Sequence, residues 1–132
     1  MKRIVLGLTI VAALAAASMP LMAHHSFAAE FDSTKQVKLT GTVTKIDWTN
    51  PHVWFYLDVK GEDGKITNWG FEMGFPHLFQ GSGWTRTTMK IGETVNVQGS
   101  MAKNGSKRVN ARNVTTPDGK RMGAASSEGV TP

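Results

Sequence analysis

The segment from His52 to Val59 alternates strictly between two kinds of side chain, and this pattern restricts the fold more than any other feature of the chain. One set is apolar and the other is polar or amphipathic: Val53, Phe55, Leu57 and Val59 against His52, Trp54, Tyr56 and Asp58. A period of two turns one face of a β-strand toward the core and the other toward solvent. The segment therefore predicts a half-buried strand that begins at the corner Thr49-Asn50-Pro51.

The first 23 residues show the three regions of a secretory signal peptide. Lys2 and Arg3 precede an apolar, alanine-rich run, and Leu21 and Ala23 occupy the −3 and −1 positions of a cleavage site. We predict that residues 1–23 are removed, that the mature chain is periplasmic or secreted, and that it has no membrane span after cleavage. An uncleaved N-terminal anchor is the alternative, although the apolar run is short for a span.

Composition limits the classes of function. Export permits disulfides, yet the chain has no cysteine, so we expect the core, aided by a metal, to stabilise it. Removing Lys2 and Arg3 lowers the formal net charge from +5 to +3, which is small for a nucleic-acid-binding domain, and we expect no nucleic-acid partner. Motifs for cysteine nucleophiles, serine hydrolases, zinc proteases and phosphate loops are absent, which favours a non-enzymatic role.

Further alternating segments predict the rest of the sheet. Val37, Leu39, Gly41 and Val43 share one parity and Ile46 and Trp48 the other, so we expect a bulge near Thr44-Lys45. A three-residue turn ending at Gly64 would pair Phe55 with Phe71 and Leu57 with Trp69. A similar turn at Lys103-Asn104-Gly105 would pair Val97 with Ala111 and Gly99 with Val109.

The order of these segments predicts an all-β domain. We expect a signal peptide (1–23), an N-terminal arm (24–36), a β-domain (37–121) and a disordered tail (122–132). Five antiparallel strands, with one short helical connection beginning at Pro76 between strands three and four, match a small OB-like Greek-key barrel. An open five-stranded meander or a β-sandwich is the structural alternative.

Four histidines suggest a metal site: His24, His25, His52 and His77. Cleavage after Ala23 would leave His24 with a free α-amine beside its imidazole, and amine and imidazole nitrogens suit Cu(II). We therefore predict that His24, His25 and His52 bind a transition metal, with copper favoured; His77 is a weaker candidate. Solvated histidines at a free terminus, or a strand-end histidine bonded to backbone, are the structural alternatives, and a copper oxidase is an enzymatic one.

The outward face of the central hairpin suggests a second function. Trp54 and Tyr56 would stand there with Asn68 and Glu72, as on the ligand face of an OB barrel. The alternative prediction is therefore a metal-free periplasmic module that binds a small ligand or a protein partner through Trp54, Tyr56 and Glu72. Simple coverage of these aromatic rings by the arm or the tail is equally compatible with the pattern.

Several short motifs also resemble one known family: His24-His25-Ser26-Phe27, Gly41-Thr42-Val43, Thr49-Asn50-Pro51-His52, Gly83-Trp84-Thr85 and Pro117-Asp118-Gly119. Between His24 and about Arg121 the chain resembles the exported bacterial family called domain of unknown function 6152. The resemblance implies an OB-like periplasmic domain and marks positions 24, 25 and 52 as motif histidines. It implies no activity, and Phe75-Pro76-His77-Leu78 departs from the family pattern.

Overall fold

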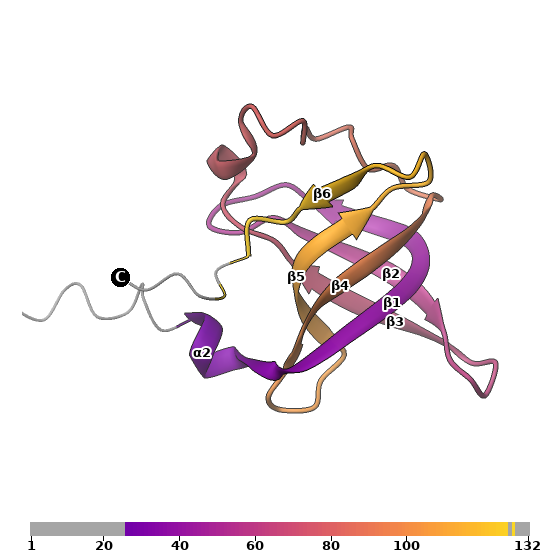
Figure 1. The fold of residues 1–132 in the computed structure, drawn as a ribbon. Coiled ribbons are helices and arrows are strands. Elements are labelled where there is room, and N and C mark those ends of the chain that lie inside the picture. Colours follow the sequence, from indigo (N-terminus) through magenta and orange to yellow (C-terminus); the bar gives the residue numbers. More distant parts are fainter. Residues whose placement is uncertain (1–25, 127, 129–132) are drawn as a thin grey trace, which may run out of the picture.

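The computed structural model describes residues 26–126 and 128, so the predicted signal peptide and both His24 and His25 lie outside the described part. The fold is mostly β, with one short helix and one 3-10 turn (Figure 1). In chain order the elements are α2 (Ser26–Glu30), β1 (Phe31–Asp47), β2 (Trp54–Lys60), β3 (Ile66–Glu72), η1 (Pro76–Phe79), β4 (Thr94–Ala102), β5 (Arg108–Thr115) and β6 (Arg121–Gly123). Within these residues no helix has the length and apolar character needed to cross a membrane.

The strands form one six-stranded sheet in the order β3-β2-β1-β4-β5-β6. Neighbours in this order are antiparallel, and β3 also pairs with β5 in parallel, which makes a near-closed ring of the first five strands. Figure 1 shows the long β1 curving around the side of this ring. It pairs with β4 along its first part and with β2 along its second part.

The predicted bulge in β1 is confirmed, because the β1–β2 register shifts between Val43 and Lys45. Gly41 lies just before it, where β1 crosses close to β2. A Cβ atom at Gly41 would come within 2.6 Å of the Asp58 carbonyl oxygen. The bulge and the missing side chain together let one strand serve both neighbours.

The predicted β2–β3 hairpin is also confirmed. Phe55 pairs with Phe71 and Leu57 with Trp69, and Gly64 adopts a φ of 79° in the turn. The rings of Phe55 and Phe71 stack with centroids 5.0 Å apart, and neither side chain is exposed. Burying each such side chain stabilises the fold by about 1.5–3 kcal/mol.

The predicted β4–β5 register is wrong. Gly99 pairs with Ala111 rather than Val109, and Val97 pairs with Val114. The reason is a longer connection, residues 103–107, together with a register shift between Gln98 and Gly99. Glycine is required at the shift, because a Cβ atom on Gly99 would come within 2.1 Å of the backbone oxygen of residue 110.

The N-terminal side of the β-domain begins earlier than the alternation predicts. Helix α2 and the first part of β1 occupy residues 26–36, where an arm was expected. Phe31 is buried and stacks on Phe27 with ring centroids 5.9 Å apart. The alternation misses this part of the strand because its register against β4 shifts between Asp32 and Gln36.

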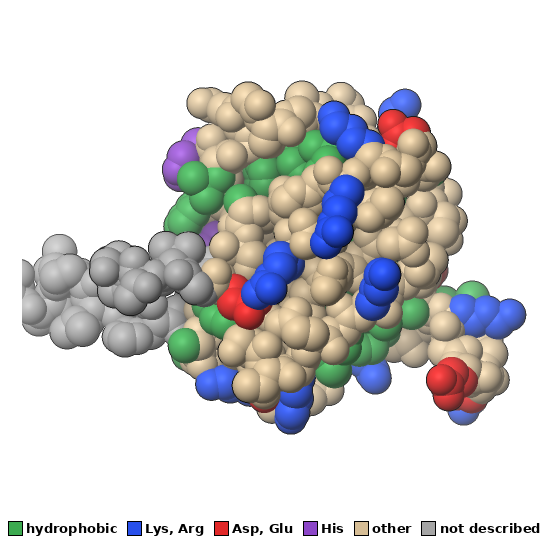
Figure 2. All heavy atoms as spheres, in the orientation of Figure 1, with side chains coloured by type: hydrophobic (Ala, Val, Ile, Leu, Met, Phe, Trp, Pro, Cys, Tyr) green, Lys and Arg blue, Asp and Glu red, His purple; other side chains and the backbone are tan. Residues whose placement is uncertain are grey.

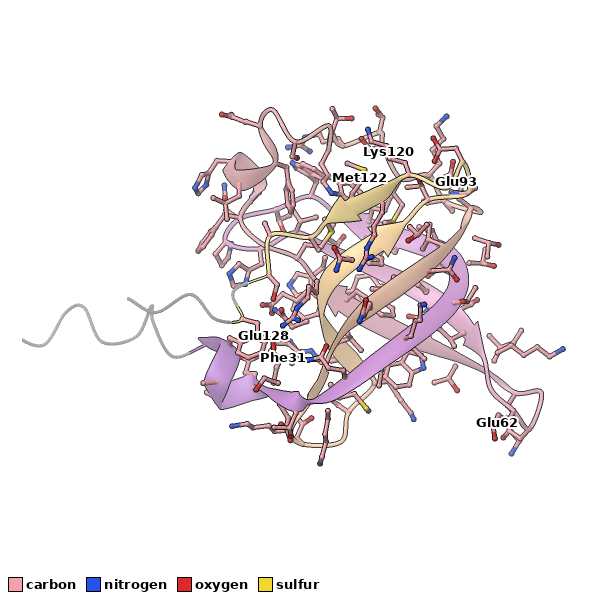
Figure 3. The ribbon with its side chains drawn as sticks, viewed as in Figure 1. Phe31, Glu62, Glu93, Lys120, Met122 and Glu128 are labelled. Atoms are coloured by element: carbon pink, nitrogen blue, oxygen red, sulfur yellow. The ribbon has the colours of Figure 1, made fainter. Side chains whose placement is uncertain are left out.

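The C-terminal side also differs from the expectation, because a sixth strand follows the predicted five. Met122 on β6 is buried, and Ala124 has no exposed surface. The backbone of Ala124 accepts a hydrogen bond from Gly74 at 2.9 Å and donates one to Arg112 at 2.8 Å. Two small apolar contacts in a polar sequence are too brief a pattern to predict a strand; Figure 3 labels Met122 on β6.

Candidate functional site

A histidine and a buried glutamate meet where β2 begins and β3 ends. His52 lies two residues before β2, and Glu72 is the last residue of β3. Backbone hydrogen bonds between Val53 and Met73 (2.8 Å) and between Val53 and Gly74 (3.1 Å) continue the hairpin past both strands. They hold the His52 Nδ1 atom 3.3 Å from Oε1 of Glu72.

Glu72 lies deeper than the sequence predicts. The alternation places it on the outward face with Trp54 and Tyr56, but the residue is only 5% exposed. The parallel pairing of β3 with β5 sets Asn110 beside it, and Nδ2 of Asn110 donates a hydrogen bond to its Oε1 at 3.2 Å. Ser126 in turn donates to Oδ1 of Asn110. A strand far along the chain and the C-terminal segment therefore cover this carboxyl group.

Burial sets the protonation of the pair. It raises the pKa of Glu72 to about 7, and the charge of Glu30 raises it further, while Arg108 and the Asn110 hydrogen bond act in the opposite direction. Burial also lowers the pKa of His52, against a smaller raising effect of Glu30. Both shifts disfavour charge, so near neutral pH the Nδ1 and Oε1 atoms share a single proton and the neutral form of the pair is favoured.

Aromatic and apolar side chains surround His52 on its other side. The Phe75 ring meets the His52 ring edge-on with centroids 4.9 Å apart, and His77 of η1 lies 5.6 Å from Phe75. Phe75 and Leu78 are both more than one-third exposed. Figure 2 shows histidine side chains beside hydrophobic ones at this edge of the molecule.

The histidine prediction is therefore only partly open to inspection. His52 is held by a carboxylate, whereas His24 and His25 lie outside the described residues. Among residues 26–126 and 128, no group of three or more His, Cys, Asp or Glu side chains could hold a metal ion. Any metal bound at His52 would need ligands from another part of the chain.

The predicted aromatic surface lies next to this pair. Trp54 and Tyr56 border a hollow of about 510 Å³ on the outer face of β2 and β3. The guanidinium of Arg108 lies over the Trp54 ring, 4.7 Å from its centroid, and 3.6 Å from the Glu30 carboxylate. Arg108 thus links the hollow to α2.

Sequence reasoning missed two residues that shape the His52–Glu72 pair. Asn110 was expected on the outward face of β5 but has no exposed surface. Glu30 fell in the predicted arm, yet its charge affects both members of the pair. No local pattern marks either residue, because their roles depend on the β3–β5 pairing and on α2.

Comparison with known proteins places the chain in a family. The model of a family of unknown function (DUF6152) matches residues 11–111. The chain belongs to this family. No curated protein and no solved structure matches it significantly. The family match covers β1 to β4, η1 and the start of β5, including His52 and Glu72.

Proposed function

We propose that this member of the family of unknown function is an exported domain that binds Cu(II) through His24, His25 and His52. The observation that carries the proposal is the contact of 3.3 Å between His52 Nδ1 and the buried Glu72 carboxyl group. Histidines that bind metals usually present their other ring nitrogen to a carboxylate or carbonyl, which sets the tautomer and the ring orientation. The contact leaves Nε2 of His52 as the nitrogen for a metal.

The position of α2 supports a contribution from the N-terminus. His25 is bonded directly to Ser26, the first residue of α2. Glu30, the last residue of α2, is close enough for its charge to affect the pKa of both His52 and Glu72. The two predicted N-terminal ligands are therefore only a few residues along the chain from the His52–Glu72 pair.

The proposed ligands favour copper by their chemistry. Cleavage after Ala23 would give His24 an α-amine with an ordinary pKa near 8, which is far easier to deprotonate than a lysine. Among divalent first-row metals, Cu(II) binds sites of amine and imidazole nitrogen most tightly. The role of such a site would be copper sequestration, delivery or sensing outside the cytoplasm.

We also infer that the ring of strands is an OB-like Greek-key barrel. The support is the cyclic order β1-β2-β3-β5-β4, with β3 and β5 parallel and β1 bent between two partners. The 3-10 turn η1 joins β3 to β4, at the position of the helical connection expected for that fold. β6 is an addition at the edge of the sheet.

Titration of Cu(II) into two forms of the protein tests the proposed site. One form begins at His24 and the other carries one extra residue before it, which removes the α-amine of His24 from the chelate. We expect the form with the authentic terminus to bind at least about tenfold more tightly and to give a distinct copper EPR spectrum. Equally weak binding by both forms would exclude the N-terminal ligands.

Two substitutions then test the contribution of the β-domain. We expect His52→Ala to change the copper EPR spectrum and Glu72→Gln to weaken binding by about 10- to 100-fold. His77→Ala is the matched control, because His77 lies beyond Phe75 and is not a proposed ligand. An unchanged spectrum after His52→Ala would remove His52 from the ligand set.

A further inference from the structure

The outer face of β2 and β3 carries a hollow that the proposed metal site does not use. Its volume is about 510 Å³, and six residues from three strand regions line it: Trp54, Tyr56, Asn68, Gly70, Lys107 and Arg108. Four come from the β2–β3 hairpin and two from the start of β5, so the parallel β3–β5 pairing creates the hollow. The backbone nitrogen of Gly70 donates to the Lys107 carbonyl at 3.0 Å, which fixes the two sides relative to each other.

The floor of the hollow is flat and apolar because of Gly70. A Cβ atom on Gly70 would lie 3.3 Å from Cε1 of Tyr56 and 3.6 Å from Cζ3 of Trp54. The two rings therefore reach toward the same glycine from neighbouring positions of β2. Two partly exposed aromatic rings beside a bare stretch of backbone form a platform on which a ring-shaped ligand can stack.

Cations surround this platform, but carboxylates already balance most of them. Lys45 lies 5.3 Å from the Tyr56 ring centroid and pairs with Asp47 at 2.8 Å. Arg108 lies over Trp54 and pairs with Glu30. Lys107 lines the hollow and, among the described residues, has no carboxylate oxygen within 4.0 Å. The hollow thus has one surplus positive charge at its β5 side.

Asn68 adds a polar group of fixed orientation to the lining. Its Nδ2 atom donates hydrogen bonds to Asp58 at 2.8 Å and to Thr44 at 3.1 Å. Both donor hydrogens of this amide are then engaged, so Oδ1 is the atom left to accept a hydrogen bond from a ligand hydroxyl. The lining therefore combines a stacking surface, one acceptor and one surplus cation.

We infer that this hollow binds an acidic saccharide, that is, a sugar ring carrying a carboxylate or a sulfate. The C–H face of the sugar would stack on Trp54 and Tyr56, its acidic group would pair with Lys107 and Arg108, and a hydroxyl would donate to Asn68. Saccharides and oligonucleotides both bind the corresponding face of OB folds. A single surplus cation fits one acidic group per sugar ring, whereas a phosphodiester chain needs several cations along its path.

Calorimetric titration of the metal-free mature protein with four probes tests the ligand class. The probes are an oligogalacturonate hexasaccharide, a heparin-derived hexasaccharide, neutral cellohexaose and a six-nucleotide oligodeoxythymidylate. We expect at least one acidic saccharide to bind at least about tenfold more tightly than cellohexaose, because each charge-assisted contact adds to the stacking. The uronate and sulfate arms show which acidic group is preferred. Equal binding of neutral and acidic saccharides, tighter binding of the oligonucleotide or no binding of any probe would overturn the inference.

Variants tie the binding to the hollow. We expect Lys107→Ala to weaken the acidic probe several-fold, whereas Lys120→Ala leaves binding unchanged. Lys120 is the matched control because it precedes β6, away from Phe31 and α2 (Figure 3). Equal losses in the two lysine variants would indicate a general charge effect and overturn the site.

Two further variants separate stacking from folding. Trp54→Ala should weaken binding about tenfold or more through lost stacking, and Gly70→Ala should weaken it by raising the floor while the strand is kept. Circular dichroism confirms that each variant is folded before titration. Retained affinity in a folded Gly70→Ala or Trp54→Ala protein would overturn the site. His52→Ala should leave saccharide binding unchanged, so failure of the metal proposal and failure of this inference are separate results.

Discussion

Replacing Glu72 by glutamine should remove most of the pH dependence that this group gives to the stability of the metal-free protein. Glutamine has nearly the same shape, and its oxygen can still accept the hydrogen bond from Asn110. Its amide can also donate to His52, so the neutral contacts of the site are kept. The substitution therefore removes the ionisation of residue 72 with little change in packing.

The magnitude follows from the shifted pKa. Burial raises the pKa of Glu72 from 4.5 to about 7, so between these pH values the folded protein holds a proton that the unfolded chain has released. The stability from this group is fully present below about pH 4.5 and is lost as the pH rises through about 7. Each pH unit of that window is worth about 1.4 kcal/mol, which gives a total loss of about 3 kcal/mol.

The neighbouring histidine acts in the opposite direction. Burial lowers the pKa of His52, so its contribution to stability is present above its ordinary value of 6.5 and is lost as the pH falls through the lowered value. The histidine is present in the wild type and in Glu72→Gln alike. The difference between their unfolding free energies therefore reports mainly on Glu72.

Urea unfolding of chelator-treated protein, from about pH 4.5 to about pH 8.5, measures this difference. We expect the wild type to lose about 3 kcal/mol relative to Glu72→Gln across the range. Glu62→Gln is the matched control, because Glu62 is exposed in the turn between β2 and β3 (Figure 3). Parallel pH curves for the wild type and Glu72→Gln would refute the buried-carboxyl reasoning.

Three further predictions concern the fold. Leu57→Asp places an unpaired charge at a side chain with no exposed surface, and we expect circular dichroism to show no cooperative thermal transition; a native-like transition would contradict the core assignment. Gly99→Ala should lower the free energy of unfolding by at least about 2 kcal/mol in urea titration, since its Cβ would clash with the backbone oxygen of Asn110. Met122→Ala should cost about 2–5 kcal/mol in the same assay if β6 belongs to the folded core, and an unchanged midpoint would exclude that.

The confirmed predictions and the wrong one differ in how far apart the interacting residues are. The β2–β3 register followed from side-chain parity and a three-residue turn, with Gly64 in the left-handed conformation that the turn requires. The β4–β5 register failed although the parity there was similar. The fit of Gly99 against the backbone of its partner strand decided that register, and a single strand carries no record of such a fit.

The candidate site shows the same division. The corner before β2 and the alternation after it placed His52 beside the outward aromatic residues. They did not show that Glu72 is buried or that its carboxyl group contacts His52. Solvent access to one strand depends on what other segments cover it, and the covering residues Asn110 and Ser126 come from later in the chain.

By itself, the sequence determined the features that depend on neighbouring residues: the two faces of β2, the bulge in β1, the turn at Gly64 and the family to which the chain belongs. The tertiary structure alone decided how β3 meets β5 and how α2 and the C-terminal segment close around them. Burial and electrostatic fields are properties of segments brought together from distant parts of the chain. For that reason the pKa of Glu72, its contact with His52 and the hollow beside Lys107 emerge only once the chain is folded.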